Sequence, residues 1–200
     1  MAGMLIAIEG LDQSGKETQA QRLRERLRGA GHKVRLLSFP DYGTSIGEEI
    51  ARALQGEREY GSDVMQLLFV ANRHERREAM LEWIAGGLIL VVDRYRASTI
   101  AYGEALGLEI TWLEDIQRRL PRADLTIFID IEPATAARRK AHGRDRYESD
   151  LTLLERVRAS YQRQAADASW IRVDGEPTKD EVAQQIFAAV SERQGLGIGD

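Results

Sequence analysis

Short apolar runs alternate along the chain with longer stretches in which charged and apolar residues recur at helical spacing. The apolar runs cover residues 5–9, 33–39, 88–93, 125–131 and 170–173, and the helical stretches cover residues 18–28, 63–85, 151–168 and 179–193. Nearly continuous apolar strands separated by helices are typical of a parallel sheet that is covered on both faces. The pattern therefore predicts a three-layer α/β fold with a five-stranded parallel sheet flanked by helices.

The helical stretch over residues 63–85 is more apolar than a surface helix requires. More than one stripe of its circumference is covered by apolar side chains, namely Val64, Met65, Leu67, Leu68, Phe69, Val70 and Ala71. We expect it to have a second buried face, against a ligand pocket, another subunit or the interior of the same domain. We find no internal repeat or low-complexity linker, so we expect a single domain over residues 1–200.

Composition narrows the class of protein. Apolar residues make up 43% of the 200 residues and charged residues 30%, which is typical of a globular protein. The formal net charge of -4 argues against a protein that coats nucleic acid. Cysteine is absent, so thiolate metal sites and cysteine nucleophiles are excluded. No segment approaches the roughly 20 apolar residues of a membrane-spanning helix, and the N-terminus lacks a signal-sequence pattern, so we expect a cytoplasmic protein.

A glycine-rich loop follows the first apolar run and leads directly into a helical stretch. Its residues are Gly10, Leu11, Asp12, Gln13, Ser14, Gly15, Lys16, Glu17 and Thr18. In this context backbone amides point at phosphates, and the helix N-terminus favours negative charge. We expect the whole loop to bind the phosphates of ATP, with Lys16 bridging the β- and γ-phosphates, as in P-loop NTPases. The alternative is a glycine turn that only starts a helix.

Two carboxylates are candidates for holding Mg²⁺. Glu17 stands where such loops usually carry a Ser or Thr hydroxyl, so either it reaches the metal through water or the metal depends on the phosphates and another carboxylate. The run over residues 88–93 delivers Asp93 and Arg94 to the carboxyl end of a strand, where ligands bind in open parallel sheets. Asp93 is suited to Mg²⁺ or its waters, and Arg94 to a phosphate. A salt bridge that merely ends the strand is the alternative.

Four motifs occur in an order and spacing that resemble thymidylate kinases over nearly the whole chain. They are Glu9-Gly10-Leu11-Asp12-Gln13-Ser14-Gly15-Lys16, Phe39-Pro40-Asp41-Tyr42-Gly43-Thr44-Ser45-Ile46-Gly47, Leu68-Phe69-Val70-Ala71-Asn72-Arg73, and Asp93-Arg94-Tyr95 followed by Ser98 and Ala101-Tyr102. The resemblance implies a P-loop kinase that uses ATP and Mg²⁺ to phosphorylate dTMP. Together with the apolar helix it also implies a homodimer with helices packed across a two-fold axis.

The resemblance assigns roles to the acceptor residues. It implies that Phe69 stacks on the thymine and that Arg73 bonds a thymine carbonyl; their spacing of four permits both to face one base. Without the resemblance, Phe69 as core and Arg73 as a solvated charge would be equally reasonable. It further implies that Tyr102 packs under the deoxyribose and that Asp12 lies near the acceptor end of the nucleotide. The remaining acceptor positions that it implies are Phe39, Tyr42, Arg94, Ser98 and Thr99.

A basic stretch with a glycine lies near residues 138–150, in an otherwise acidic chain. Such stretches are usually solvated surface. Related kinases carry at this place a short mobile lid that closes on ATP and brings arginine charge to the transferring phosphoryl group. In the family the catalytic arginine sits in the glycine loop or in the lid. Gln13 occupies the glycine-loop position where some members of the family carry this arginine, so the resemblance favours Arg144 or Arg146 as the catalytic arginine. It implies that this arginine acts together with Lys16, Arg94 and Asp12.

Several other functions are alternatives to a dTMP kinase. A GTPase switch would need a guanine-reading Asn-Lys-x-Asp tetrapeptide, which does not occur in the sequence. A non-enzymatic ATP-binding P-loop protein would show no dTMP-dependent formation of ADP. A deoxynucleoside kinase would share the fold, the glycine loop and a related Asp-Arg motif, but the Phe39-Pro40 segment and the lid favour a monophosphate acceptor. Another nucleoside-monophosphate kinase is a further alternative.

Overall fold

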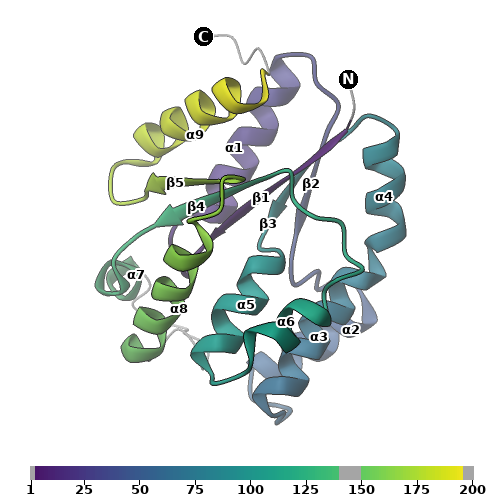
Figure 1. Cartoon of the computed structure of the whole chain (residues 1–200), viewed down its shortest axis with the longest axis vertical. Coiled ribbons are helices and arrows are strands. Elements are labelled where there is room, and N and C mark those ends of the chain that lie inside the picture. The colour runs from purple at the N-terminus through teal and green to yellow at the C-terminus, as the bar shows by residue number, and fades with distance from the viewer. Residues whose placement is uncertain (1–2, 140–149, 196–200) are drawn as a thin grey trace.

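Five parallel strands form the central sheet of the computed structural model, which describes residues 3–139 and 150–195 (Figure 1). The strands are β1 (Met4–Gly10), β2 (Val34–Ser38), β3 (Ile89–Asp93), β4 (Leu125–Asp130) and β5 (Trp170–Asp174). Their order in the sheet is β2-β3-β1-β4-β5. The five-stranded parallel sheet predicted from the apolar runs is confirmed, with strand ends shifted by one residue at most.

Eight helices lie between these strands in sequence within the described residues, and a ninth follows β5. They are α1 (Lys16–Gly29), α2 (Ser45–Leu54), α3 (Ser62–Glu75), α4 (Arg77–Ala85), α5 (Arg96–Ala105), α6 (Ile110–Asp115), α7 (Pro133–Arg139), α8 (Leu151–Gln164) and α9 (Lys179–Gln194). Among the described residues, no helix combines the length and the apolar character needed to cross a bilayer.

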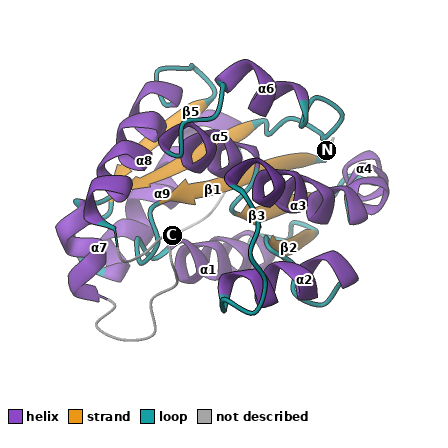
Figure 2. Cartoon of the chain, turned by 90° about the horizontal axis from the view of Figure 1, so that it is seen from below, coloured by secondary structure: helices purple, strands orange, loops and turns teal. Residues whose placement is uncertain are grey.

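The two faces of the sheet pack against different helices because alternate residues of each strand point in opposite directions. On β1, Ile6 and Ile8 belong to a cluster with apolar residues of α1 and α9. Leu5 and Ala7, on the other face, belong to a cluster with residues of α3 and α4. A third cluster joins α5 and α8 around Phe128 of β4. Figure 2 shows the strands between α1 on one side and α5, α6 and α8 on the other, which is the predicted three-layer arrangement.

The carboxyl ends of the strands meet at one edge of the sheet. Ile8 near the end of β1 is in register with Asp93 at the end of β3, and Ser38 at the end of β2 pairs with the same Asp93. The glycine-rich loop follows β1, and the Phe39-Pro40 segment, whose own peptide bond is cis, follows β2. Topology alone therefore brings the loop, the Phe39 segment and Asp93 to one place.

The stretch over residues 63–85 is two helices rather than the continuous helix that its pattern predicts. The chain turns at Arg76, whose backbone N–H donates to the Arg73 carbonyl, and α4 begins at the next residue. Arg76 also pairs with Asp41 through its Nε atom, at 2.7 Å from Oδ2. A contact with the loop after β2 thus coincides with the break, and no glycine or proline marks it in the sequence.

Candidate active site

The glycine-rich loop curls around the N-terminal end of α1 and lines a cavity of about 630 Å³. Gln13 and Gly15 adopt left-handed conformations, with φ of 64° and 91°. Gly10 cannot carry a side chain, since a Cβ atom there would lie 2.5 Å from the carbonyl oxygen of Ile129. Most of the predicted loop residues line the cavity, namely Asp12, Gln13, Ser14, Gly15, Lys16, Glu17 and Thr18. Gly10 and Leu11 are buried and do not line it.

Lys16 is the buried cation of this cavity. Its side chain is 5% exposed, and its Nζ atom donates to the Leu11 carbonyl at 2.6 Å. Burial, together with the nearby Arg94 charge, lowers the pKa of Lys16 to about 8, against the opposing effect of Asp12 and Asp93. A bound phosphate would add negative charge beside this ammonium group and favour its charged form.

Asp12 and Arg94 form an ion pair beside Lys16. Tyr102 donates its hydroxyl to the second oxygen of Asp12 at 2.7 Å. Burial by itself would raise the pKa of Asp12, but Arg94, Lys16 and Tyr102 hold it well below its usual range. For the Arg94 cation the effects are reversed: burial would lower its pKa, but the Asp12 carboxylate raises it. Both groups are therefore fully charged at neutral pH, and Asp12 fixes the guanidinium of Arg94 at the edge of the cavity.

The two candidate metal ligands differ in burial. Asp93 ends β3 and lines the cavity, and its Oδ1 atom is shielded from solvent and has no hydrogen-bond partner among the described residues. Burial raises the pKa of Asp93, while Lys16 and Arg94 oppose that shift. Glu17 lines the same cavity and is exposed. No group of three His, Cys, Asp or Glu residues within the described part of the chain could hold a metal by protein ligands alone.

A second, narrower cavity of about 110 Å³ adjoins the first. The residues expected at the acceptor site all line it: Asp12, Phe39, Tyr42, Phe69, Arg73, Arg94, Ser98, Thr99 and Tyr102. Asp12 and Arg94 belong to both linings, so the two cavities meet at this ion pair. The arrangement offers a polar donor cavity and an aromatic acceptor cavity with a charged junction between them.

Several polar groups of the acceptor cavity are fixed by hydrogen bonds to neighbouring side chains. Arg73 is 3% exposed and donates from Nη1 to the Thr99 hydroxyl at 2.6 Å. Burial lowers the pKa of Arg73 to about 10, which leaves it charged at neutral pH. Ser98 donates its hydroxyl to the buried Glu9 carboxylate at 2.6 Å. Tyr42 is half exposed and forms part of the rim.

These geometries coincide with a family signature. The family model described as "Thymidylate kinase" matches residues 8–186. The chain belongs to the thymidylate kinase family. Among its relatives, a thymidylate kinase of Schizosaccharomyces pombe is 38% identical over 94% of this chain and 92% of its own length. The thymidylate kinase of Homo sapiens is 35% identical over 92% of this chain and 88% of its own.

A solved structure of the family has the same fold. A thymidylate kinase from Candida albicans superposes with a TM-score of 0.83 at 30% identity and covers 98% of this chain and 94% of its own. That enzyme is described as having a broad substrate specificity and a novel structural element, which are properties of the Candida albicans protein.

The predicted lid lies mostly outside the described residues. Arg138 and Arg139 end α7, and Asp150 caps the N-terminus of α8 by accepting from Leu153 N–H. Arg144 and Arg146 fall between them, in the part that the structure does not describe. Arg139 lines the donor cavity and donates to the carbonyl oxygens of Gln13 at 3.3 Å and Gly175 at 3.0 Å.

Several residues of the site carry no role in the sequence-based prediction. Pro40, Leu54 and Gln66 also line the acceptor cavity. Asn72 is fully buried, accepts from the backbone N–H of Asp41 at 2.8 Å and donates to the Thr44 hydroxyl at 2.8 Å, so it fixes the loop after β2 to α3. Asn72 belongs to the Leu68–Arg73 motif, but the motif alone does not reveal which of its residues faces a ligand and which holds a loop in place.

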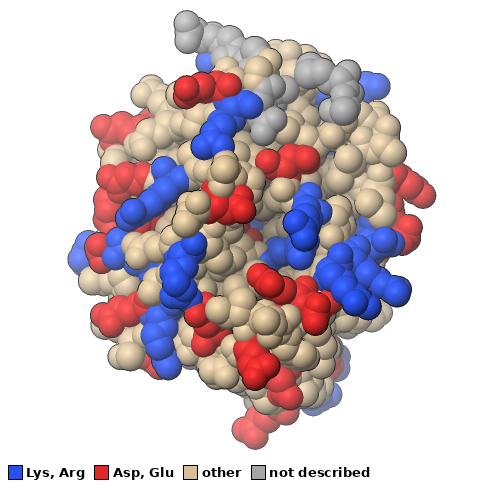
Figure 3. Space-filling model, viewed as in Figure 1, with Lys and Arg blue, Asp and Glu red and all other residues tan. Residues whose placement is uncertain are grey.

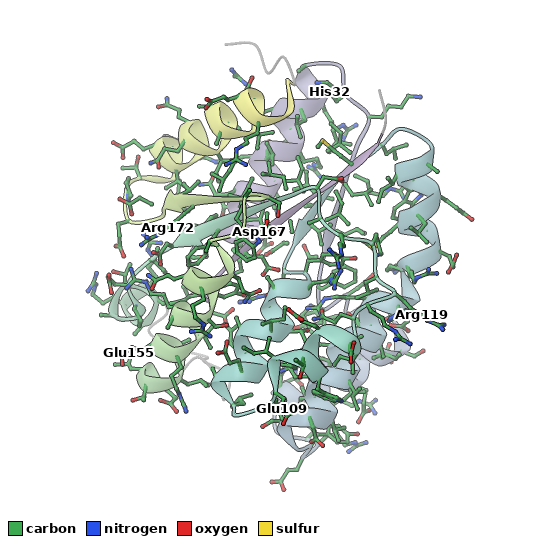
Figure 4. The ribbon with its side chains drawn as sticks, in the orientation of Figure 1. His32, Glu109, Arg119, Glu155, Asp167 and Arg172 are labelled. Carbon is green, nitrogen blue, oxygen red and sulfur yellow. The ribbon has the colours of Figure 1, made fainter. Side chains whose placement is uncertain are left out.

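Charges on the molecular surface are mixed. Figure 3 shows acidic and basic side chains interspersed over the face formed by α5, α6 and α8. His32 lies beyond the C-terminal end of α1, whereas the glycine-rich loop precedes the N-terminal end of that helix (Figure 4). His32 therefore has no place in the chemistry of either cavity.

Proposed function

We propose that this chain transfers the γ-phosphoryl group of ATP to dTMP, forming ADP and dTDP. The observation that carries the proposal is the pair of adjoining cavities that share Asp12 and Arg94. A donor phosphate in one cavity and an acceptor phosphate in the other would face each other across this ion pair. Catalysis would then consist mainly of positioning and electrostatic stabilisation.

On the donor side, the backbone amides of the glycine-rich loop and the Lys16 ammonium group would hold the ATP phosphates. Lys16 would move from the Leu11 carbonyl to the β- and γ-phosphates. Arg139 joins the glycine-rich loop to the segment after β5 and lines the same cavity. Together these groups would favour a donor with several phosphates.

On the acceptor side, Phe69 would stack on the base and Arg73 would donate to a base carbonyl. Tyr102 is held by Asp12 and would lie under the sugar, while Phe39, Tyr42, Ser98 and Thr99 shape the rest of the cavity. Arg94 would bind the acceptor phosphate. That phosphate is already an oxyanion, so the reaction needs no strong general base.

Mg²⁺ fits the donor cavity as a cofactor bound with ATP. The buried Oδ1 atom of Asp93, which has no partner in the described part of the chain, is the kind of ligand that Mg²⁺ or its bound water prefers, and Glu17 lines the same cavity. When bound, the metal neutralises charge on the β- and γ-phosphates. Because the described residues offer few carboxylates, we infer that waters and phosphates complete its coordination.

The proposal includes a lid and a dimer. Arg144 or Arg146, in the stretch 138–150, would supply positive charge to the transferring phosphoryl group. A second copy of the chain would pack on α3, where Val64 is 38% exposed and Leu67 is 44% exposed. Exposed leucine and valine three residues apart form an apolar stripe on one helix face.

A panel of acceptors tests the proposed function. ADP release is measured with ATP and Mg²⁺ in the presence of dTMP, dUMP, dCMP, dGMP, AMP or thymidine. We expect dTMP to give the highest kcat/KM. Activity with thymidine in preference to dTMP would instead indicate a deoxynucleoside kinase, and ATP binding without any acceptor-dependent ADP release would indicate a non-enzymatic protein.

A further inference from the structure

Gln66 lies on the face of α3 that borders the acceptor cavity. It precedes Phe69 by three residues and Arg73 by seven, and all three side chains line the same cavity. Residues at these spacings share one side of a helix. Gln66 therefore belongs to the same wall as the two residues to which base binding is attributed.

Both polar atoms of the Gln66 side chain lack a hydrogen-bond partner within the described residues. The residue is 1% exposed, and Nε2 and Oε1 are each shielded from solvent. Buried amides are normally paired, because removing an amide from water without a partner is costly. An unpaired amide at the wall of a cavity is explained when a ligand supplies the missing partner.

The other buried side-chain amides of the described residues are paired at one end at least. Gln19 donates to the Lys179 carbonyl at 2.9 Å, and Gln117 donates to the Leu113 carbonyl at 3.0 Å. Asn72 both donates and accepts. These amides have structural partners, whereas Gln66 has none at either end within the part of the chain that the structure describes.

We propose that Gln66 is a binding residue for the base of the acceptor nucleotide, an inference that rests on the proposed function. Its amide presents a donor and an acceptor side by side, which matches the adjacent carbonyl oxygen and N3–H of a thymine or uracil ring. The Nε atom of Arg73 is also buried and has no partner among residues 3–139 and 150–195, and it can only donate. Together the two side chains complement an imide edge.

Gln66 and Arg73 would contribute differently to the selectivity for the base. A side-chain amide can turn over and also match the N3 and amino group of cytosine, so Gln66 alone does not exclude dCMP. Arg73 cannot pair with an amino group, because both are donors. Gln66 therefore adds affinity for dTMP and dUMP alike, while Arg73 rejects dCMP, and neither residue distinguishes the methyl group of thymine.

The test replaces Gln66 with methionine, which has a similar length and no amide. Melting temperatures with and without dTMP, and steady-state kinetics with dTMP, dUMP and dCMP, are measured for wild type, Gln66→Met and Gln117→Met. The control removes a buried amide that lies in neither cavity lining. Binding of dTMP by the wild type, seen as a rise in melting temperature, tests the proposed function first.

For Gln66→Met we expect KM to rise roughly tenfold for both dTMP and dUMP with little change in kcat, because uniform binding is lost. The dTMP-induced rise in melting temperature should shrink, and the free variant should melt no lower than wild type, since an unpaired amide has been removed. Gln117→Met should melt lower with an unchanged KM.

Two results would overturn the inference while leaving dTMP kinase activity intact. One is a Gln66→Met variant with wild-type KM and a wild-type dTMP-induced shift. The other is an equal rise in KM for Gln117→Met, which would show that the effect is not local to the cavity. A wild-type protein that neither binds nor phosphorylates dTMP would overturn the proposed function together with this inference.

Discussion

Lys16 links the electrostatics of the free site to nucleotide binding. With its pKa lowered to about 8, mainly by burial, about half of the lysine side chains are neutral at pH 8 in the free protein. Bound phosphates favour the charged form and raise this pKa, so ATP binding at pH 8 should take up about half a proton. Calorimetric titrations in buffers of different ionisation enthalpy measure this uptake.

The control for this prediction is Lys16→Ala, which removes the titrating group. That variant should show no such uptake and should lose phosphoryl transfer by roughly 10²-fold or more, because charge stabilisation in the transition state is lost. Equal proton uptake in wild type and variant, or near wild-type turnover in the variant, would contradict the role given to Lys16.

At the scale of elements, Asp130 ties α8 and β5 to the end of β4. Its side chain is 4% exposed and accepts from Arg158 at 2.7 Å and from Arg172, labelled in Figure 4, at 2.9 Å. Burial would raise the pKa of Asp130, but these hydrogen bonds hold it below its ordinary value. A folded-state pKa below the unfolded one stabilises the protein above about pH 4, and this contribution is lost as pH falls.

Asp130→Asn should therefore lower the free energy of unfolding at pH 7 by on the order of 2 kcal/mol, the contribution expected of hydrogen bonds to a charged group. The difference from wild type should shrink between pH 4 and pH 3. Urea unfolding at pH 7 and at pH 3 measures the free energy of unfolding of both proteins. The control variant is Asp174→Asn, at an exposed aspartate at the end of β5. A difference that stays constant with pH would contradict the ion-pair account.

The lid arginines are expected to act on turnover and not on dTMP binding. Arg144→Ala or Arg146→Ala should lower kcat, by roughly 10³-fold if that arginine contacts the transition state, while dTMP affinity changes little. The exposed Arg156 of α8 supplies the control variant, Arg156→Ala, which should retain full turnover. Full activity in both lid variants would mean that the basic stretch is solvated surface and that Lys16 and Arg94 carry the charge alone.

The sequence predicts some elements better than others for physical reasons. Strands buried on both faces leave nearly continuous apolar runs, so the sheet is predicted almost to the residue. The division between α3 and α4 is not predicted by the sequence, because Arg76 contacts Asp41 only in the folded chain. The short helix α5 starts three residues after β3 and is buried over most of its length, so no polar face separates it from the strand in the pattern.

The same contrast holds in the site. Lys16, Asp93 and Arg94 could be predicted because motif spacing and strand ends fix their position. Gln66 could not, because a sequence does not record whether a buried amide has a partner; that depends on the surroundings of α3 in three dimensions.

At the scale of the whole molecule, the exposed apolar stripe of α3 predicts a homodimer. Leu67→Glu places a charge in that stripe and should convert a species of twice the 22.5 kDa chain mass into a monomer at micromolar concentration. Leu151→Glu, at an equally exposed leucine on α8, should leave the dimer intact. Sedimentation velocity distinguishes these outcomes, and a wild-type protein that sediments only as a monomer would contradict the prediction.

In the proposed mechanism, one phosphoryl group passes between the two adjoining cavities across the Asp12–Arg94 ion pair. The most direct measurement incubates the wild-type protein with Mg²⁺, dTMP and ATP labelled in its γ-phosphate, and then follows the label. The account predicts that the label appears in dTDP in step with ADP formation, and that both depend on dTMP. Label released as inorganic phosphate, or found in no nucleotide other than ATP, would contradict it.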